Sequence, residues 1–181
     1  SLLVNTKYFD ESVEILRKNK RLDVGVHLNL TEFSPLTSTK TLEKSGNFVK
    51  KEEWYNGYFK TADEKEIESE LNEQFLKAFS SGLEITHVDG HNHIHVFPKI
   101  VGIAARLARK YSVKWIRLPY EKAGIKPYKI KPKKRLHTRK EVLSKIRLHG
   151  LLAPKYFFGG FFLKAANMYE LFSVLKSLGD G

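Results

Sequence analysis

The stretch ITHVDGHNHIHVFP, residues 85–98, holds four of the seven histidines of the chain within nine positions. Its ionisable residues all share odd-numbered positions and are His87, Asp89, His91, His93 and His95. A continuous strand would place all five on one face, where burial without partners is prohibitively costly. We therefore predict that a strand ends near Asp89–Gly90 and that the histidines spread around its carboxyl-terminal end.

Such a cluster is typical of a metal centre or a polar catalytic centre. Neutral imidazole binds divalent transition metals, and His-x-His spacing can direct two rings to one point. A carboxylate such as Asp89 can fix the tautomer of an imidazole ligand. The competing interpretation is a solvated, histidine-rich loop without a ligand.

A second histidine occupies an unusual place in DVGVHLNLT, residues 23–31. Alternation predicts a strand whose apolar side chains share one face, with His27 on the other face between Gly25 and Asn29. The small neighbour indicates that something needs room there, and sites in α/β folds lie at the carboxyl ends of strands. A hydrogen-bonded core histidine is the alternative.

The remaining pattern alternates short apolar runs with amphipathic helices. The predicted strands are residues 1–5, 22–30, 83–89, 113–119 and 155–163. The predicted helices are residues 9–20, 98–111, 138–148 and 165–178. One more helix is predicted to begin at a Thr61/Glu64 capping box and to end at Gly82. Residues 31–60 are predicted to form an irregular excursion with small elements. This alternation favours parallel strands joined by helical crossovers, in a barrel or an open α/β sheet. No linker divides the chain, so residues 1–181 are predicted to form a single domain.

Composition narrows the class of protein. With 41% hydrophobic residues and no run near the roughly 18 needed to span a bilayer, a globular chain without a membrane segment is expected. The absence of cysteine excludes disulfides and thiolate metal sites and is consistent with a cytoplasmic protein. The net charge of +12 is concentrated in residues 122–147, which form either a solvated surface or a site for an anionic partner.

The motifs that are missing also guide the choice of chemistry. The chain has no P-loop, no G-x-G-x-x-G and no G-x-S-x-G nucleophile elbow, so covalent catalysis by serine has little support. Arg117 ends the predicted strand in WIRLP and could clamp an anionic group or form a structural ion pair. Metal-activated water is the chemistry for which suitable residues remain.

Four motifs occur in order: SLLVN, GVHLNLTEFSPL, THVDGHNHIHVFP and IRLP. With them the chain resembles the YdjC-like carbohydrate deacetylases, which include chitooligosaccharide deacetylases. The resemblance implies a TIM-like (β/α) barrel with a divalent metal, Mg or Zn, and hydrolysis of N-acetyl groups from acetylated amino-sugar oligosaccharides. By position, His27 and His91 match the metal ligands, and the remaining matches, which would bind substrate or support the ligands, are Asp89, His93, His95 and Arg117.

Two motifs expected from this resemblance are absent. An upstream strand with an Asp-Asp motif, which would complete the metal site and supply a base, does not occur, and neither does a C-terminal His-Pro-Gly segment. We expect a barrel truncated at both ends, whose unpaired edges would favour a homodimer, weak metal binding or inactivity of the isolated chain. The alternative function is a catalytically impaired binding protein that uses its basic segment 122–147, although nucleic acid is not the expected partner.

Overall fold

The computed structural model describes residues 1–120, 138–157 and 168–177. The elements, in chain order, are α1 (Phe9–Lys18), β1 (Val24–Leu28), β2 (Glu43–Lys44), β3 (Asn47–Phe48), α2 (Lys51–Tyr55), the 3₁₀ helix η1 (Tyr58–Lys60), α3 (Glu64–Ser80), β4 (Ile85–Gly90), the 3₁₀ segment η2 (His91–Val96), α4 (Pro98–Lys110), β5 (Trp115–Ile116), α5 (Arg139–Leu148) and α7 (Met168–Ser177). The predicted alternation of strands and helices is confirmed.

The central sheet is parallel and has the order β1-β4-β5. Parallel bridges extend it at both sides, from Leu2 to Val26 and from Trp115 to Leu152. Five segments therefore lie side by side in the order in which they occur along the chain. Barrels have this consecutive order, whereas doubly wound open sheets reverse it at a switch point. The described residues form a parallel sheet with this consecutive order and do not close a complete barrel.

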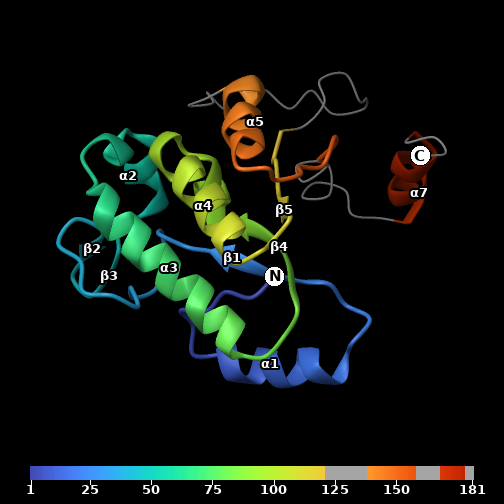
Figure 1. The fold of residues 1–181 in the computed structure, drawn as a ribbon, viewed down its shortest axis with the longest axis horizontal. Coiled ribbons are helices and arrows are strands. Elements are labelled where there is room, and N and C mark those ends of the chain that lie inside the picture. The colour runs from blue at the N-terminus through green and yellow to red at the C-terminus, as the bar shows by residue number, and fades with distance from the viewer. Residues whose placement is uncertain (121–137, 158–167, 178–181) are drawn as a thin grey trace.

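The two faces of the sheet differ in character. Val24, Val26 and Leu28 of β1 are buried and belong to the hydrophobic core. That core is completed by the apolar stripes of α3 and α4, which pack against each other, with α5 next to α4 (Figure 1). The opposite face carries the polar residues of the sheet, because the register pairs Gly25 with His87 and His27 with Asp89.

The helix boundaries follow local signals, with one correction. Pro98 opens α4, and Thr138 with Glu141 forms a capping box at α5. The predicted Thr61/Glu64 capping box is wrong: Asp63 caps α3, since its Oδ1 accepts hydrogen bonds from the backbone of Lys65 and Glu66. A carboxylate at this position satisfies two helix-end donors, so the helix begins at the residue that follows it.

Other predicted elements are shorter or fall elsewhere. In segment 1–5 only Leu2 is bridged to the sheet, and the predicted strand 113–119 is reduced to Trp115–Ile116. The predicted excursion 31–60 does contain small elements, namely β2, β3, α2 and η1. Most of the predicted strand 155–163 lies outside the described residues, and residues 155–157 are not in a strand.

The C-terminal helix was predicted by its apolar spacing, and α7 confirms it. In Figure 1 it lies apart from the helices that cover the sheet. Most of the basic segment 122–147 lies outside the described residues, which resume at Thr138 and α5. Within the described part of the chain, no helix is both long and apolar enough to cross a membrane.

Candidate active site

A buried carboxylate joins three strands on the polar face of the sheet. Asp89, on β4, is 1% exposed. Its Oδ1 lies 2.6 Å from Nδ1 of His27 on β1, and its Oδ2 lies 2.6 Å from Nη1 of Arg117, which follows β5. The hydroxyl of Ser1 also donates to Oδ2, at 3.1 Å. Asp89 thus connects residues that are far apart in sequence.

The charge of Asp89 is set by these partners. Burial alone would raise the pKa of the Asp89 carboxyl, but the hydrogen bond and charge of His27 and the charge of Arg117 outweigh it and hold the pKa well below its usual range. An ionised carboxylate only accepts hydrogen bonds, so Nδ1 of His27 carries the proton. The Nε2 atom of His27 then remains as the nitrogen that can bind a cation.

A second imidazole stands beside the first. His91 begins η2, directly after β4, and its ring centroid lies 5.5 Å from that of His27, with the planes at 72°. Its Nε2 is 3.1 Å from Oε1 of Glu32, an ion-pairing distance, but the orientation makes no hydrogen bond. The neighbouring His91 imidazole lowers the pKa of Glu32 below its ordinary value. Glu32 is a site residue that the sequence did not single out.

The donor set at this point consists of two imidazole rings. Two adjacent imidazoles suit a divalent transition metal. Among the residues that the structure describes, however, no group of three or more His, Cys, Asp or Glu side chains is placed to hold a metal ion. The His27–His91 pair therefore fits a cation only if further ligands come from outside the described residues or from water.

The turn that carries His91 is conformationally unusual. Asn92 and His93, the next two residues, have φ of +51° and +59°, the left-handed region that non-glycine residues seldom adopt. Tyr55 donates from its hydroxyl to the Asn92 carbonyl, and the Asn92 amide donates to the Thr31 hydroxyl. The prediction that the strand ends near Gly90 and the histidines spread beyond it is confirmed, because β4 ends at Gly90 and η2 follows.

The last two histidines of the stretch contact other parts of the structure. His93 makes an edge-to-face contact with Phe157 at 5.7 Å. His95 is fully buried, and its Nε2 lies 2.9 Å from the Arg117 carbonyl. Burial lowers the pKa of His95 to about 4, so this ring is neutral at physiological pH. Because the His95 ring is buried, we expect a supporting role for it and no contact with substrate.

Two glycines make room for histidines. A Cβ on Gly25 would lie 2.4 Å from the ring of His87, and a Cβ on Gly90 would lie 2.6 Å from Nδ1 of His95. The room that the sequence indicated beside His27 is thus occupied by His87, which is 60 residues further along the chain than His27. Burial lowers the pKa of His87 as well. This long-range pairing had no signal in the sequence beyond the glycine itself.

A buried polar network fixes the segment that follows β1. The Gln74 side chain, on α3, pairs with both backbone groups of Asn29, accepting from its N–H at 2.9 Å and donating to its carbonyl at 2.7 Å. Glu70 accepts from the amide of Gln74 and, through Oε2, from the backbone of Leu36 and Thr37. This network positions the excursion that carries Glu32 beside the histidines.

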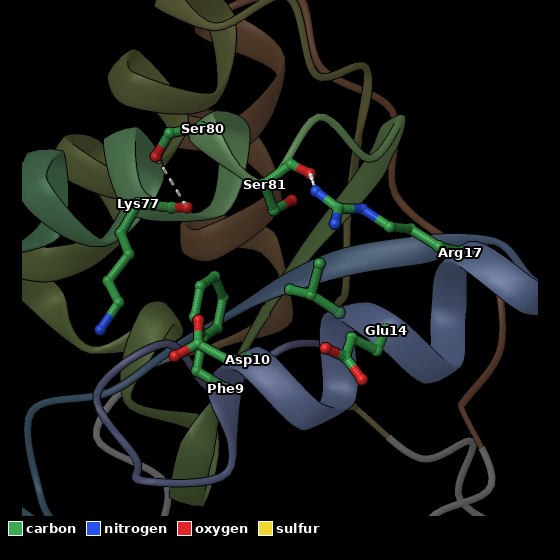
Figure 2. Close-up of a pocket in the computed structure, with 8 residues that line it drawn as sticks. Phe9, Asp10, Glu14, Arg17, Lys77, Ser80 and Ser81 are labelled. Carbon is green, nitrogen blue, oxygen red and sulfur yellow. Dashed lines mark hydrogen bonds between the residues drawn. The ribbon is translucent and has the colours of Figure 1, made fainter.

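A hollow in the described surface lies away from the candidate site. It has a volume of about 340 Å³ and lies between α1 and the end of α3, lined by residues such as Phe9, Glu14 and Lys77. Figure 2 shows Arg17 closing one side through a hydrogen bond to the Ser81 carbonyl. None of the histidines lines it, so this hollow is separate from the candidate site.

Comparison with known proteins now places the chain. A family model described as YdjC-like protein matches residues 1–181. The chain belongs to the YdjC-like family. Among similar YdjC-like relatives named carbohydrate deacetylase, that of Clostridium beijerinckii is 33% identical over 115 residues, covering 62% of this chain and 45% of the relative. The corresponding protein of Listeria welshimeri is 39% identical over 115 residues, covering 62% and 46%.

A solved structure supports the same architecture. A protein of Enterococcus faecalis V583, described provisionally as a cellobiose-phosphate cleavage protein, matches with a TM-score of 0.64 and 23% identity. The match covers 84% of this chain and 54% of that one. It establishes an α/β fold of parallel strands and helices for this YdjC-like chain. The chain spans a little under half the length of these carbohydrate deacetylase relatives, at 45% and 46%.

Proposed function

We propose that the protein to which this chain belongs removes N-acetyl groups from acetylated amino-sugar oligosaccharides, with a divalent cation held in part by His27 and His91. The observation that carries the proposal is the pairing of a carboxylate-oriented imidazole with a second imidazole at the carboxyl ends of adjacent strands. The name carbohydrate deacetylase, borne by relatives 33% to 39% identical, supports the same substrate class.

The two imidazole nitrogens bear on which divalent cation would bind. Zinc accepts nitrogen ligands readily, whereas magnesium prefers oxygen, so two imidazoles favour zinc of the two candidates. A divalent cation in such hydrolases supplies Lewis acidity and lowers the pKa of a bound water. Further ligands would come from outside the described residues or from water, and the resemblance to the family implies that its Asp-Asp strand supplies one of them.

Two residues of this chain would support the metal ligand and the substrate. Asp89 holds the proton on Nδ1 of His27 and so keeps Nε2 available. Arg117 holds Asp89 ionised while 40% of its side chain stays exposed, which leaves guanidinium donors able to bind a substrate oxygen. Asp89 itself is unsuited to act as the general base, because both of its oxygens are engaged and its pKa is lowered.

The reaction is hydrolysis of an amide. Water adds to the acetyl carbonyl carbon, the bond from that carbon to the sugar nitrogen breaks, and acetate and a free amine are released. The amine takes up a proton as it leaves. No described residue is assigned to that proton transfer.

The test measures metal binding separately from activity. We expect His27→Ala and His91→Ala each to lose zinc binding in calorimetric titrations of the full chain. His149→Ala, which removes an imidazole near the end of α5, provides the matched control and should bind as the unchanged chain does. Deacetylation of N-acetylated chitooligosaccharides, measured as acetate release by the protein expressed from its complete reading frame, should fall in the same two variants. Unchanged zinc binding in both would refute the proposed metal site.

A further inference from the structure

Phe33 combines two unfavourable features. Its backbone φ is +63°, a left-handed conformation that is strained for a bulky residue and free only for glycine. Its side chain is also 45% exposed, so the aromatic ring gains little from burial. Neither local propensity nor the hydrophobic effect explains a phenylalanine at this position.

Hydrogen bonds to three successive backbone carbonyls hold Phe33 in this strained conformation. The Glu32 carbonyl accepts from the side-chain amides of Asn29 and Asn5, at 2.6 and 3.3 Å. The Phe33 carbonyl accepts from the backbone of Phe48 at 2.8 Å, and the Ser34 carbonyl accepts from Asn5 at 3.1 Å. Strain that is over-determined in this way is typical of functional sites.

The location of Phe33 points to the same site. It directly follows Glu32, whose Oε1 lies 3.1 Å from Nε2 of His91. Thr31, on the other side of Glu32, accepts a hydrogen bond from Asn92 in the histidine turn. The strained residue therefore lies next in the chain to residues that contact His91 and the turn that carries it.

Tyr55 is an exposed aromatic residue of the same region whose position is explained by its contacts within the protein. It is also exposed, at 42%, but its hydroxyl donates to the Asn92 carbonyl and its ring contacts Phe97 edge-on at 5.0 Å. Within the described part of the chain, the Phe33 ring makes no aromatic pair and does not belong to the hydrophobic core. The contacts that explain Tyr55 have no counterpart at Phe33.

We propose that the ring of Phe33 is a substrate-binding platform on which a pyranose ring of the oligosaccharide stacks. The apolar C–H face of a pyranose matches an exposed aromatic ring, and the fixed backbone holds that ring ready without an ordering cost on binding. This inference rests on the proposed function, since it identifies a subsite for the same sugar substrate beside the same imidazoles.

The test exploits the opposite effects that one substitution has on folding and on binding. Phe33→Gly removes the ring and relieves the backbone, so the melting temperature should stay the same or rise by up to about 4 °C. The KM for N-acetylated chitooligosaccharides should nevertheless rise about 3- to 10-fold with kcat little changed. Phe33→Trp, which keeps an aromatic ring, should retain the KM of the unchanged protein.

Tyr8→Ala is the matched control, because Tyr8 is 57% exposed at the start of α1 and contacts no residue of the site. Its KM should not change. A Phe33→Gly protein with an unchanged KM and an active parent would overturn this inference alone. A parent that releases no acetate from these sugars would overturn the proposed function, and the platform with it.

Discussion

Two buried carboxylates of this chain have opposite surroundings. Asp89 is 1% exposed and contacts an imidazole and a guanidinium, groups that carry charge or change it. Glu70 is 0% exposed, and its hydrogen-bond donors among the described residues are all neutral, namely backbone N–H groups, the Thr37 hydroxyl and the Gln74 amide. Both are satisfied, as buried polar groups must be. From this contrast we infer that Asp89 supports the proposed site and Glu70 supports the fold.

The two carboxylates nevertheless act on the same region. Glu70 bonds to Gln74, and Gln74 bonds to both backbone groups of Asn29, which lies two residues after His27. Glu70 thus fixes where β1 gives way to the excursion, and Asp89 fixes how the His27 ring is oriented. Substitutions should separate these contributions, because one changes the stability of the fold and the other changes the properties of the site.

The largest effect is expected at Glu70. Glu70→Ala leaves buried donors from Leu36, Thr37 and Gln74 without an acceptor, so the free energy of unfolding should fall by about 4 kcal/mol in urea denaturation. Glu66 offers a matched control one turn earlier on α3. It accepts from two backbone N–H groups and the Thr41 hydroxyl in the same way, but at a half-exposed position, so Glu66→Ala should cost about 1 kcal/mol. Equal losses would remove the contrast between buried and accessible carboxylates.

The second largest effect is a dependence of stability on pH, and it arises from the buried His95. Burial lowers the pKa of His95 to about 4, whereas an unfolded chain protonates it near 6.5. Between these values the unfolded state binds a proton that the folded state does not, so stability is complete above pH 6.5 and is lost as the pH falls. The free energy of unfolding should decrease by about 3 kcal/mol between pH 6.5 and 4.

Urea denaturation across this pH range provides the measurement. His95→Gln keeps a side-chain donor for the Arg117 carbonyl but cannot titrate, so its stability curve should be flatter between pH 6.5 and 4. If the slope persists unchanged in this variant, the buried ring is not its source.

Asp89→Asn should affect the site more than the fold. The amide cannot hold the Nδ1 proton of His27 as an ionised carboxylate does, and such supporting partners are worth about 10- to 100-fold in metal affinity. We expect zinc binding in calorimetric titrations to weaken by that factor. Asp23→Asn, at an exposed carboxylate just before β1, should bind zinc as the unchanged chain does. Undiminished affinity in Asp89→Asn would mean that Asp89 has no role in the metal site.

The sequence predicted those features that depend on local signals. The position of Pro98 predicted the start of α4, and the parity of the histidines predicted the end of β4 at Gly90. It also named His27, Asp89, His91 and Arg117, which the structure brings together through three strands. Their roles as metal ligands and supporting residues stay predictions.

Long-range contacts account for what the sequence could not predict. The ring that fills the space beside Gly25 belongs to His87, and only the register between β1 and β4 brings the two together. Glu70 occurs on a helix face whose spacing indicates only apolar packing, and its partners Leu36 and Thr37 lie more than 30 residues away in the sequence. The consecutive order of the strands also depends on which segments pair, and hydrophobic periodicity does not determine that pairing.

The smallest effect is expected at Arg117, where a substitution keeps the charge of one partner of Asp89 and changes only its shape. Arg117→Lys keeps the positive charge near Asp89 but loses the planar guanidinium. Because 40% of this side chain is exposed, solvent screens the ion pair, and the free energy of unfolding should fall by less than about 1 kcal/mol. The Arg117 carbonyl that accepts from His95 is backbone and stays in place. Zinc affinity should therefore change less than in Asp89→Asn, and a loss as large as in that variant would show that the guanidinium, and not only its charge, holds Asp89 in position.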